Sequence, residues 1–143
     1  MLETMYDAPG IGLAAPQVGV LHRLIVLDCV KEEGAAPCPT VMKQAQPSPV
    51  VFVNPKIVEA SESRSDAEEA CLSIPGITTF INRPDWVILE WTDARGETQR
   101  QRLDGAWARC AQHELDHLNG IVTFDRLDAP ARHAAETQYA VQR

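Results

Sequence analysis

Two histidines separated by three residues, with a glutamate between them, are the residues of this sequence best suited to chemistry. They lie in residues 112–117, QHELDH. On a helix, His113 and His117 are one turn apart, so both imidazoles can reach one ion while Glu114 lies beside them. Two neutral imidazoles and a third protein ligand hold a divalent cation and leave a position open for water, whose proton the carboxylate can take. The pattern predicts a hydrolytic metal site; the alternative is a polar turn of a surface helix.

The natural candidate for the third ligand is Cys71, because a thiolate is a strong donor to a borderline cation and the chain offers few competitors. A free cysteine is otherwise most often a small buried hydrophobic residue. We assign that role to the remaining cysteines, Cys29, Cys38 and Cys110. His22 and His133 have no histidine or cysteine partner at i+3 or i+4, and we expect ordinary surface or packing roles for them.

A glycine-rich stretch over residues 10–19, GIGLAAPQVG, contains one side chain capable of two-sided hydrogen bonding, Gln17. The glycines on either side of Ile11 allow the backbone to approach a ligand closely. Taken alone, the stretch favours the plainer alternative of a tight turn between a helix and a strand.

The apolar pattern predicts the elements that must position these residues. Strands are predicted over residues 22–30, 50–55 with a continuation to 60, 77–83, 86–92, 97–103 and 122–124. Loops or turns are predicted over residues 31–49, 61–68 and 93–96. Helices are predicted over residues 1–8, which look cut off at their start, from an N-cap at Asp104 to residue 118, and over residues 131–143. On the second helix, Ala106, Cys110, His113 and His117 form one stripe, which places the ion against a small apolar surface.

Length and composition indicate one globular domain. The chain has 143 residues and a mass of 15.8 kDa, with 45% hydrophobic and 23% charged residues. A net charge of -7 disfavours binding to nucleic-acid backbones. No apolar run is long enough to span a membrane. The four cysteines show no CxxC spacing and there is no signal peptide, so we expect a reducing compartment, most simply a bacterial cytoplasm.

Three stretches together resemble the peptide deformylases in order and spacing: residues 10–19, residues 69–76 (EACLSIPG) and residues 112–117. The resemblance implies an α+β fold in which antiparallel sheets surround the metal-bearing helix. It implies removal of the N-formyl group from formyl-methionine at the start of nascent proteins. It also implies one ion per chain on Cys71, His113 and His117, natively Fe2+, with zinc, nickel or cobalt able to substitute. Residues 1–143 would form a single catalytic domain that lacks the N-terminal part of the usual family domain.

The chemistry and the resemblance assign catalytic roles to further residues. We expect Glu114 to accept the proton of the attacking water and then to deliver it to the departing amine. The tetrahedral intermediate carries an oxyanion, which the side-chain amide of Gln17 can stabilise. The family pattern adds the backbone N–H of Leu72 as a second donor.

Substrate binding and support of the metal ligands are assigned to neighbouring residues. The backbone around Ile11 and Gly12 would pair with the extended peptide as an added strand. The methionine side chain would lie in a pocket formed by Ile11, Ala106, Cys110 and the ring face of His113. Glu69 is expected to support the site by pairing with Arg83, whereas Asp116 either orients a ligand or is solvated.

Two residues depart from the family pattern at the expected substrate site. Ala70 stands where the family usually has glycine, so its methyl group narrows the channel, or restricts the backbone if φ is positive there. Arg109 stands where the family tends to have an apolar residue, and its guanidinium would shrink the pocket or attract an acidic position of the substrate.

The expected partners are formyl-methionyl nascent peptides, with no nucleic acid and no membrane. Ribosome association is left open, because the C-terminal tail is brief and not notably basic. The sequence also leaves the oligomeric state open. Two competing hypotheses are a catalytically silent relative that binds a metal ion and a peptide end, and a zinc peptidase that uses the same HExxH helix.

Overall fold

The computed structural model describes residues 1–29 and 49–143, and three α-helices and two short 3-10 helices lie in these residues. The helices are α1 (Leu2–Asp7), η1 (Ala15–Val18), α2 (Gly105–Leu118), η3 (Thr123–Arg126) and α3 (Ala129–Val141). The strands are β1 (Gly12–Ala14), β2 (Leu24–Leu27), β3 (Val50–Ala60), β4 (Arg64–Cys71), β5 (Ile74–Pro84), β6 (Trp86–Thr92) and β7 (Thr98–Asp104). Most of the loop expected over residues 31–49, with Cys38, lies outside the described residues. No helix in the described part of the chain combines the length and apolar character needed to cross a membrane.

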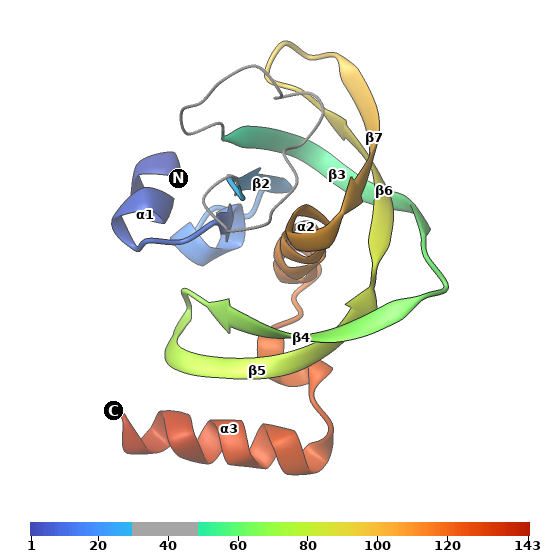
Figure 1. Cartoon of the computed structure of the whole chain (residues 1–143). Helices are drawn as coiled ribbons and strands as arrows, with labels where there is room; N and C mark the ends of the chain where they lie inside the picture. Colours follow the sequence, from blue (N-terminus) through green and yellow to red (C-terminus); the bar gives the residue numbers. More distant parts are fainter. Residues whose placement is uncertain (30–48) are drawn as a thin grey trace.

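Antiparallel strands surround the central helix α2. One sheet has five strands in the order β1-β2-β3-β6-β7, and β4 pairs with β5 in a separate two-stranded sheet. The larger sheet curves around α2, and the β4–β5 hairpin runs past another side of the helix (Figure 1). Helix α3 packs against β5, at the bottom of the view. This is the α+β arrangement that the sequence predicts.

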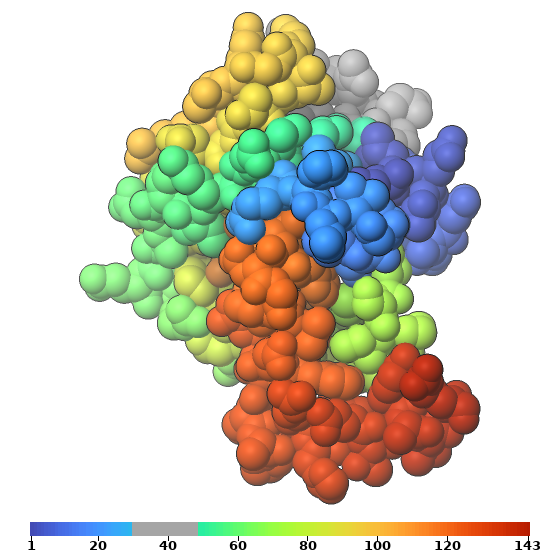
Figure 2. All heavy atoms as spheres, turned by 180° about the vertical axis from the view of Figure 1, so that it is seen from behind, coloured from blue at the N-terminus to red at the C-terminus, as the bar shows by residue number. Residues whose placement is uncertain are grey.

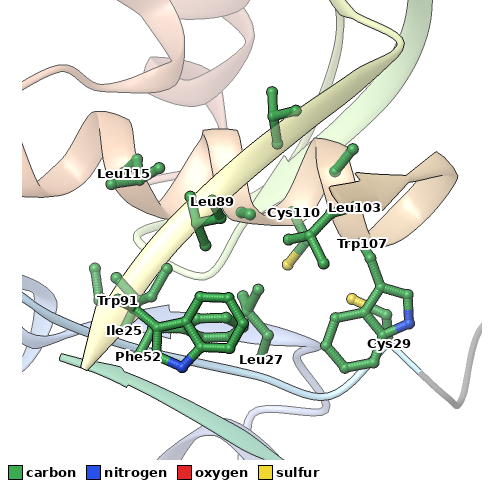
Figure 3. Close-up of a cluster of buried hydrophobic side chains, with 14 residues drawn as sticks. Ile25, Leu27, Cys29, Phe52, Leu89, Trp91, Leu103, Trp107, Cys110 and Leu115 are labelled. Carbon is green, nitrogen blue, oxygen red and sulfur yellow. The ribbon is translucent and has the colours of Figure 1, made fainter. Parts of the chain in front are cut away.

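The main hydrophobic core lies between α2 and the concave side of the larger sheet (Figure 3). Trp107 and Leu115 of α2 pack there with Phe52 of β3 and with Leu89 and Trp91 of β6. Strand β6 alternates between buried and partly buried residues, as its period-two sequence predicts, because successive side chains of a strand point to opposite faces. The helix that carries QHELDH is therefore held along one face by an apolar core.

The expected exposed turn over residues 61–68 is wrong, because β4 begins at Arg64 within it. Most side chains of β4 are exposed, so the strand has no apolar alternation that sequence analysis can detect. The N–H and C=O groups of its backbone find their partners instead in a long antiparallel pairing with β5, in which Arg64 lies opposite Pro84 and Ala70 opposite Thr78. The strand matters here because it ends at Cys71.

Two further expectations are corrected by local hydrogen bonds. Residues 122–124 do not form a strand; a 3-10 turn begins at Thr123, and the Asp125 side chain accepts a hydrogen bond from the backbone N–H of Val122 at 3.0 Å. Asp104 is the residue before α2, but its side chain caps no backbone N–H. Its carboxylate instead accepts hydrogen bonds from Arg102, two residues earlier on the same strand.

Candidate metal centre and active site

The end of β4 and one face of α2 bring together the three predicted metal ligands. Cys71 Sγ lies 3.4 Å from His117 Nε2, which lies 3.1 Å from His113 Nε2. One ligand atom from each of the three residues lies within 4.8 Å of the others. In a tetrahedral zinc site with two imidazoles and a thiolate, neighbouring donor atoms are about 3.3 to 3.6 Å apart. The donor set and its spacing therefore fit one divalent cation. His22 and His133 are exposed and lie outside this group.

The predicted pair Glu69–Arg83 lies directly behind the imidazole of His113. The Arg83 Nε donates to both carboxylate oxygens of Glu69, at 2.7 and 2.9 Å. Glu69 Oε1 is 3.5 Å from His113 Nδ1, the ring nitrogen that does not face Cys71. A carboxylate on one ring nitrogen fixes the ring orientation and directs the other nitrogen to the cation.

Asp116 extends this support and does not reach the ligands directly. It is buried, with 7% of its surface exposed, and accepts hydrogen bonds from Arg83 Nη1 at 2.9 Å and from Arg126. Of the two roles left open for Asp116, solvation is thus excluded, and its contact with the ligands is indirect, through Arg83 and Glu69. The sequence analysis missed Arg126, because no periodic pattern connects a 3-10 turn with the buried face of α2.

The ligand side chains favour a thiolate in contact with a protonated imidazole when no cation is present. Burial raises the pKa of Cys71, but hydrogen bonds with His113 and His117 and with the Ser73 backbone outweigh burial and lower it to about 5. Burial lowers the pKa of His113, but hydrogen bonds with Cys71 and Glu69 outweigh it and raise the value to about 10. At neutral pH the sulfur is therefore ready to bind a cation, whereas His113 must first lose a proton.

We expect zinc binding at pH 7.5 to release about one proton per chain, because a cation needs the neutral imidazole of His113 and the thiolate of Cys71 is already formed. The chosen pH lies below the His113 pKa of about 10 and above the Cys71 pKa of about 5, so the proton comes from the imidazole. Calorimetric titration in two buffers with different ionisation enthalpies measures the number. Release of no proton would contradict the charged imidazole, whereas ionisation of water on the bound zinc, whose pKa falls toward 7, adds up to one further proton without involving the thiolate.

Glu114 combines deep burial with an unpartnered oxygen. Only 4% of its surface is exposed, and its Oε2 has no hydrogen-bond partner among the described residues. Burial raises its pKa to about 7, against the attraction of His113 and His117, which lowers it. A carboxylate next to the metal ligands, with one oxygen left without a partner among the described residues, has the free lone pair and the proton affinity that a general base needs.

Gln17 is oriented so that its amide N–H groups point toward the end of β4. The backbone N–H of Ala14 donates to Gln17 Oε1 at 2.9 Å, which leaves Nε2 to donate to Ser73 Oγ at 2.8 Å. The same nitrogen is 3.7 Å from Cys71 Sγ. The glycine-rich stretch thus forms the short strand β1 and the turn η1, and places a hydrogen-bond donor beside the candidate metal centre. The Ser73 partner was not expected from the sequence.

A cavity of about 1090 Å³ opens beside this centre and is lined by Cys71, His113 and Glu114. The residues predicted to bind substrate also line it, together with Leu72: Ile11, Gly12, Ala70, Ala106, Arg109 and Cys110. Strand β1 is an edge strand of the larger sheet. The carbonyl of Ile11 already accepts a hydrogen bond from Asp28 N–H at 2.8 Å, so an added peptide strand would use the remaining backbone groups near Gly12. Gln17 and His117 do not line this cavity, although both contact Cys71.

The two departures from the family pattern have different surroundings. Ala70 is an exposed strand residue without positive φ, so its methyl group causes no backbone strain. Arg109 donates to the carbonyls of Ile81 at 2.8 Å and Ser65 at 2.9 Å, and lies 3.6 Å from Glu69 Oε2. Its guanidinium thus ties the β4–β5 hairpin to α2.

Gly12 is the point of closest approach between β1 and α2. A Cβ atom at this position would lie 2.6 Å from Cys110 Sγ and 2.8 Å from Glu114 Oε1. We expect Gly12→Ala to destabilise the fold by about 1 to 3 kcal/mol and to displace Glu114, because both neighbours are nearly fully buried and at least one side chain must shift to admit the methyl group. Urea unfolding measures the change in free energy.

Gly10→Ala is the matched control for that substitution. Its Cβ would lie 2.7 Å from Leu72 Cδ1, the end of a flexible side chain that can rotate away. We therefore expect a smaller loss of stability at Gly10 than at Gly12. Equal losses of stability at both glycines would show that the contact with Cys110 and Glu114 is not the reason why residue 12 must be glycine.

Comparison with known proteins places these features in one family. The model of the family "Polypeptide deformylase" matches residues 1–133. The chain is 49% identical to peptide deformylase of Rhizobium meliloti over 125 residues, which cover 87% of this chain and 66% of that protein. It is 44% identical to peptide deformylase of Synechococcus sp. RCC307, covering 96% of this chain and 63% of the relative.

Solved structures agree with the sequence comparison. A peptide deformylase from Synechococcus elongatus in complex with actinonin superposes with a TM-score of 0.83 at 42% identity, covering 98% of this chain and 71% of that one. Peptide deformylase from Ehrlichia chaffeensis superposes with a TM-score of 0.85 at 35% identity, covering 99% and 78%. The chain spans between 57% and 66% of the length of the curated relatives it matches.

Proposed function

The chain belongs to the polypeptide deformylase family, and on that premise we propose that it hydrolyses the formamide at the start of formyl-methionyl peptides and releases formate. One observation carries the proposal. The carboxylate of Glu114, whose Oε2 has no hydrogen-bond partner among the described residues, lies in the same cavity as Cys71 and His113, two of three side chains whose donor atoms converge on one point. A base, a cation site and a cavity for substrate are thus combined on one helix and one strand end.

The cation would be held by Cys71, His113 and His117, one ion per chain, with Fe2+ as the proposed native ion and zinc, nickel or cobalt as substitutes. When bound, such a cation polarises a carbonyl oxygen and lowers the pKa of water toward 7. The mixed sulfur and nitrogen donors suit a borderline divalent cation, which supports this group of metals over magnesium or calcium.

The proton transfers are assigned to Glu114. It takes the proton from the attacking water as the new carbon–oxygen bond forms, and returns that proton to the amine nitrogen as the carbon–nitrogen bond breaks. Its burial keeps the carboxylate free of bulk water, and the absence of a hydrogen-bond partner on Oε2 among the described residues leaves that oxygen open to the proton. One residue therefore serves as base and then as acid.

The negative charge that develops on the formyl oxygen is stabilised by donors in place before the reaction begins. We assign this role to Gln17 Nε2 and to the backbone N–H of Leu72. The support for Gln17 is its orientation, because the Ala14 N–H holds its carbonyl and turns its amide hydrogens toward Cys71 and Ser73. Losing one such donor typically costs about 2.7 to 4 kcal/mol of barrier.

The substrate would lie along the free edge of β1, with the methionine side chain in the apolar part of the cavity near Ile11, Ala106 and Cys110. Edge pairing uses backbone groups, so the residues after methionine would contribute affinity without strict selection. The proposed substrates are nascent chains in the cytoplasm of a bacterium, an assignment supported by the bacterial origin of the relatives.

The test is formate release from formyl-Met-Ala-Ser by protein loaded with ferrous iron under anaerobic conditions. We expect release by the parent and by Glu97→Ala, an exposed glutamate in the turn before β7, and none by Glu114→Ala. No release by a parent that still binds its ion would support the silent relative. Cleavage of an internal peptide bond would support the zinc peptidase, and either result would overturn the proposal.

A further inference from the structure

A second cavity, of about 440 Å³, lies on a different face of α2 from the candidate metal centre. Gln112, Leu115 and Asp116 of α2, with Asn119 directly after it, form one wall, and residues before β2 and in β3, β4, β5 and η3 form the others. Figure 2 shows the side of the molecule on which the blue, green and orange parts of the chain meet. The volume is within the range of about 300 to 1,000 Å³ that is typical of small-molecule sites.

The charge of this cavity is opposite to that of the protein. Five cationic side chains line it, with a single carboxylate, Asp116: Arg23, Lys56, Arg64, Arg83 and Arg126. The chain as a whole has only 13 lysines and arginines and a net charge of -7. Concentration of cations in one concave region focuses a positive potential there and attracts anions.

Three of the five cations are paired with carboxylates. Arg83 and Arg126 both contact Asp116, and Arg83 also holds Glu69. Lys56 Nζ lies 3.0 Å from Glu90 Oε1. These pairs involve the carboxylates of Asp116, Glu69 and Glu90, so the three paired cations add little net attraction for an external anion.

Arg23 and Arg64 are held by neutral groups only, among the residues that the structure describes. Arg23 Nη1 donates to the carbonyl of Leu118 at 3.3 Å and to Asn119 Oδ1 at 3.0 Å. Arg64 donates from Nε and Nη2 to the side chain and the backbone carbonyl of Asn82. Each guanidinium is therefore fixed in direction while its charge is uncompensated and further N–H groups are available.

Contacts within the fold explain the positions of both arginines, but neither is paired with a carboxylate among the described residues. A cation near the C-terminus of a helix is stabilised by the helix dipole, and this explains why Arg23 lies at the end of α2. Arg64 belongs to β4, and its hydrogen bonds to Asn82 of β5 hold it across the hairpin. These contacts fix the two guanidinium groups beside one cavity and leave their charges available to an anion.

We propose that this cavity binds the phosphate group of a small phosphorylated molecule, with Arg23 and Arg64 as its principal ligands. A guanidinium presents several N–H donors in a plane and forms paired, charge-assisted hydrogen bonds with phosphate oxygens. A volume of about 440 Å³ suits a phosphate with a small attached group, and the net charge of -7 disfavours the backbone of a long nucleic acid. The two arginines are not among the residues assigned to formamide hydrolysis, although Arg83 and Asp116, which support His113, also line the cavity.

The proposal is tested by calorimetric titration of the zinc-loaded protein at low ionic strength with three probes: inorganic phosphate, adenosine 5′-monophosphate and a ten-residue RNA. We expect Arg23→Gln/Arg64→Gln to weaken binding of the first two probes at least about tenfold, as loss of hydrogen bonds to a charged group predicts. Arg95→Gln removes one exposed charge in the β6–β7 turn, away from the cavity, and should change the affinity less than about twofold. The single variant Arg64→Gln tests the site without disturbing the end of α2, and unfolding curves check that each variant is folded.

Four results would overturn the proposal. Absence of binding at millimolar phosphate and nucleotide would show that the cavity holds no such ligand. Binding that is unchanged in both cavity variants would place the phosphate elsewhere, including on the zinc ion, and an equal loss in Arg95→Gln would show a response to net charge alone. RNA that binds much more tightly than the mononucleotide, through the same arginines, would replace the small molecule by a nucleic-acid backbone.

Discussion

Replacing Glu114 with glutamine is expected to lower kcat/KM for formyl-Met-Ala-Ser by about 10² to 10⁴, the range typical of a lost general base. Glutamine has nearly the same volume, so the close packing against Gly12 and Cys110 is kept while the proton acceptor is lost. The metal ligands do not include Glu114, and metal content measured by elemental analysis should therefore remain one ion per chain. A steady-state assay of formate release gives the rate.

The pH profile separates this role from a structural one. Burial raises the Glu114 pKa to about 7 in the absence of a cation, and a bound cation would lower it. Because the carboxylate must be ionised to accept a proton, kcat/KM should fall as the pH decreases, with a midpoint at or below about 7, and this limb should be missing from the residual activity of Glu114→Gln. An acid limb that persists unchanged in the variant would assign the base to another residue.

Cys71→Ser is expected to lower the affinity for zinc by at least about 100-fold, more than the loss of an outer-shell partner usually costs. The hydroxyl of serine stays protonated at neutral pH, whereas the thiolate of Cys71, with a pKa of about 5, offers a full negative charge. Formate release should be lost with the ion. Competition with a chromophoric chelator measures the affinity.

Cys29→Ser is the matched control for that substitution. Cys29 is also fully buried, and its sulfur lies 4.0 Å from the Ala106 carbonyl, outside the group of converging donors. It should retain the zinc affinity of the parent. Equal weakening of zinc binding in both variants would mean that the loss at Cys71 reflects a general disturbance of the core. It would contradict the role of the Cys71 thiolate as a metal ligand.

The regular parts of the fold are the parts that a single sequence encodes locally. The HExxH spacing requires only a helix to put both imidazoles on one side, and α2 provides it from Gly105 to Leu118. The alternation in Trp86–Thr92 likewise predicts β6 with its correct ends. In both cases the pattern and the element have the same period.

The features that sequence analysis missed depend on contacts between distant segments. Strand β4 is polar, so its pairing with β5 is visible only once the hairpin is formed. The sequence does not distinguish Asp116 from other acidic residues, because its partners Arg83 and Arg126 come from other elements of the fold. The cavity that unites Arg23 and Arg64 is likewise a product of the fold, since these arginines come from two separate segments of the chain.

X-ray absorption spectroscopy of the zinc-loaded protein tests most directly whether one ion is bound jointly by Cys71, His113 and His117. The distances around the ion should show one sulfur at about 2.3 Å and imidazole nitrogens at about 2.0 to 2.1 Å, and the sulfur contribution should disappear in Cys71→Ser. A first shell of nitrogen and oxygen alone in the parent, unchanged by the substitution, would contradict the site described for this chain.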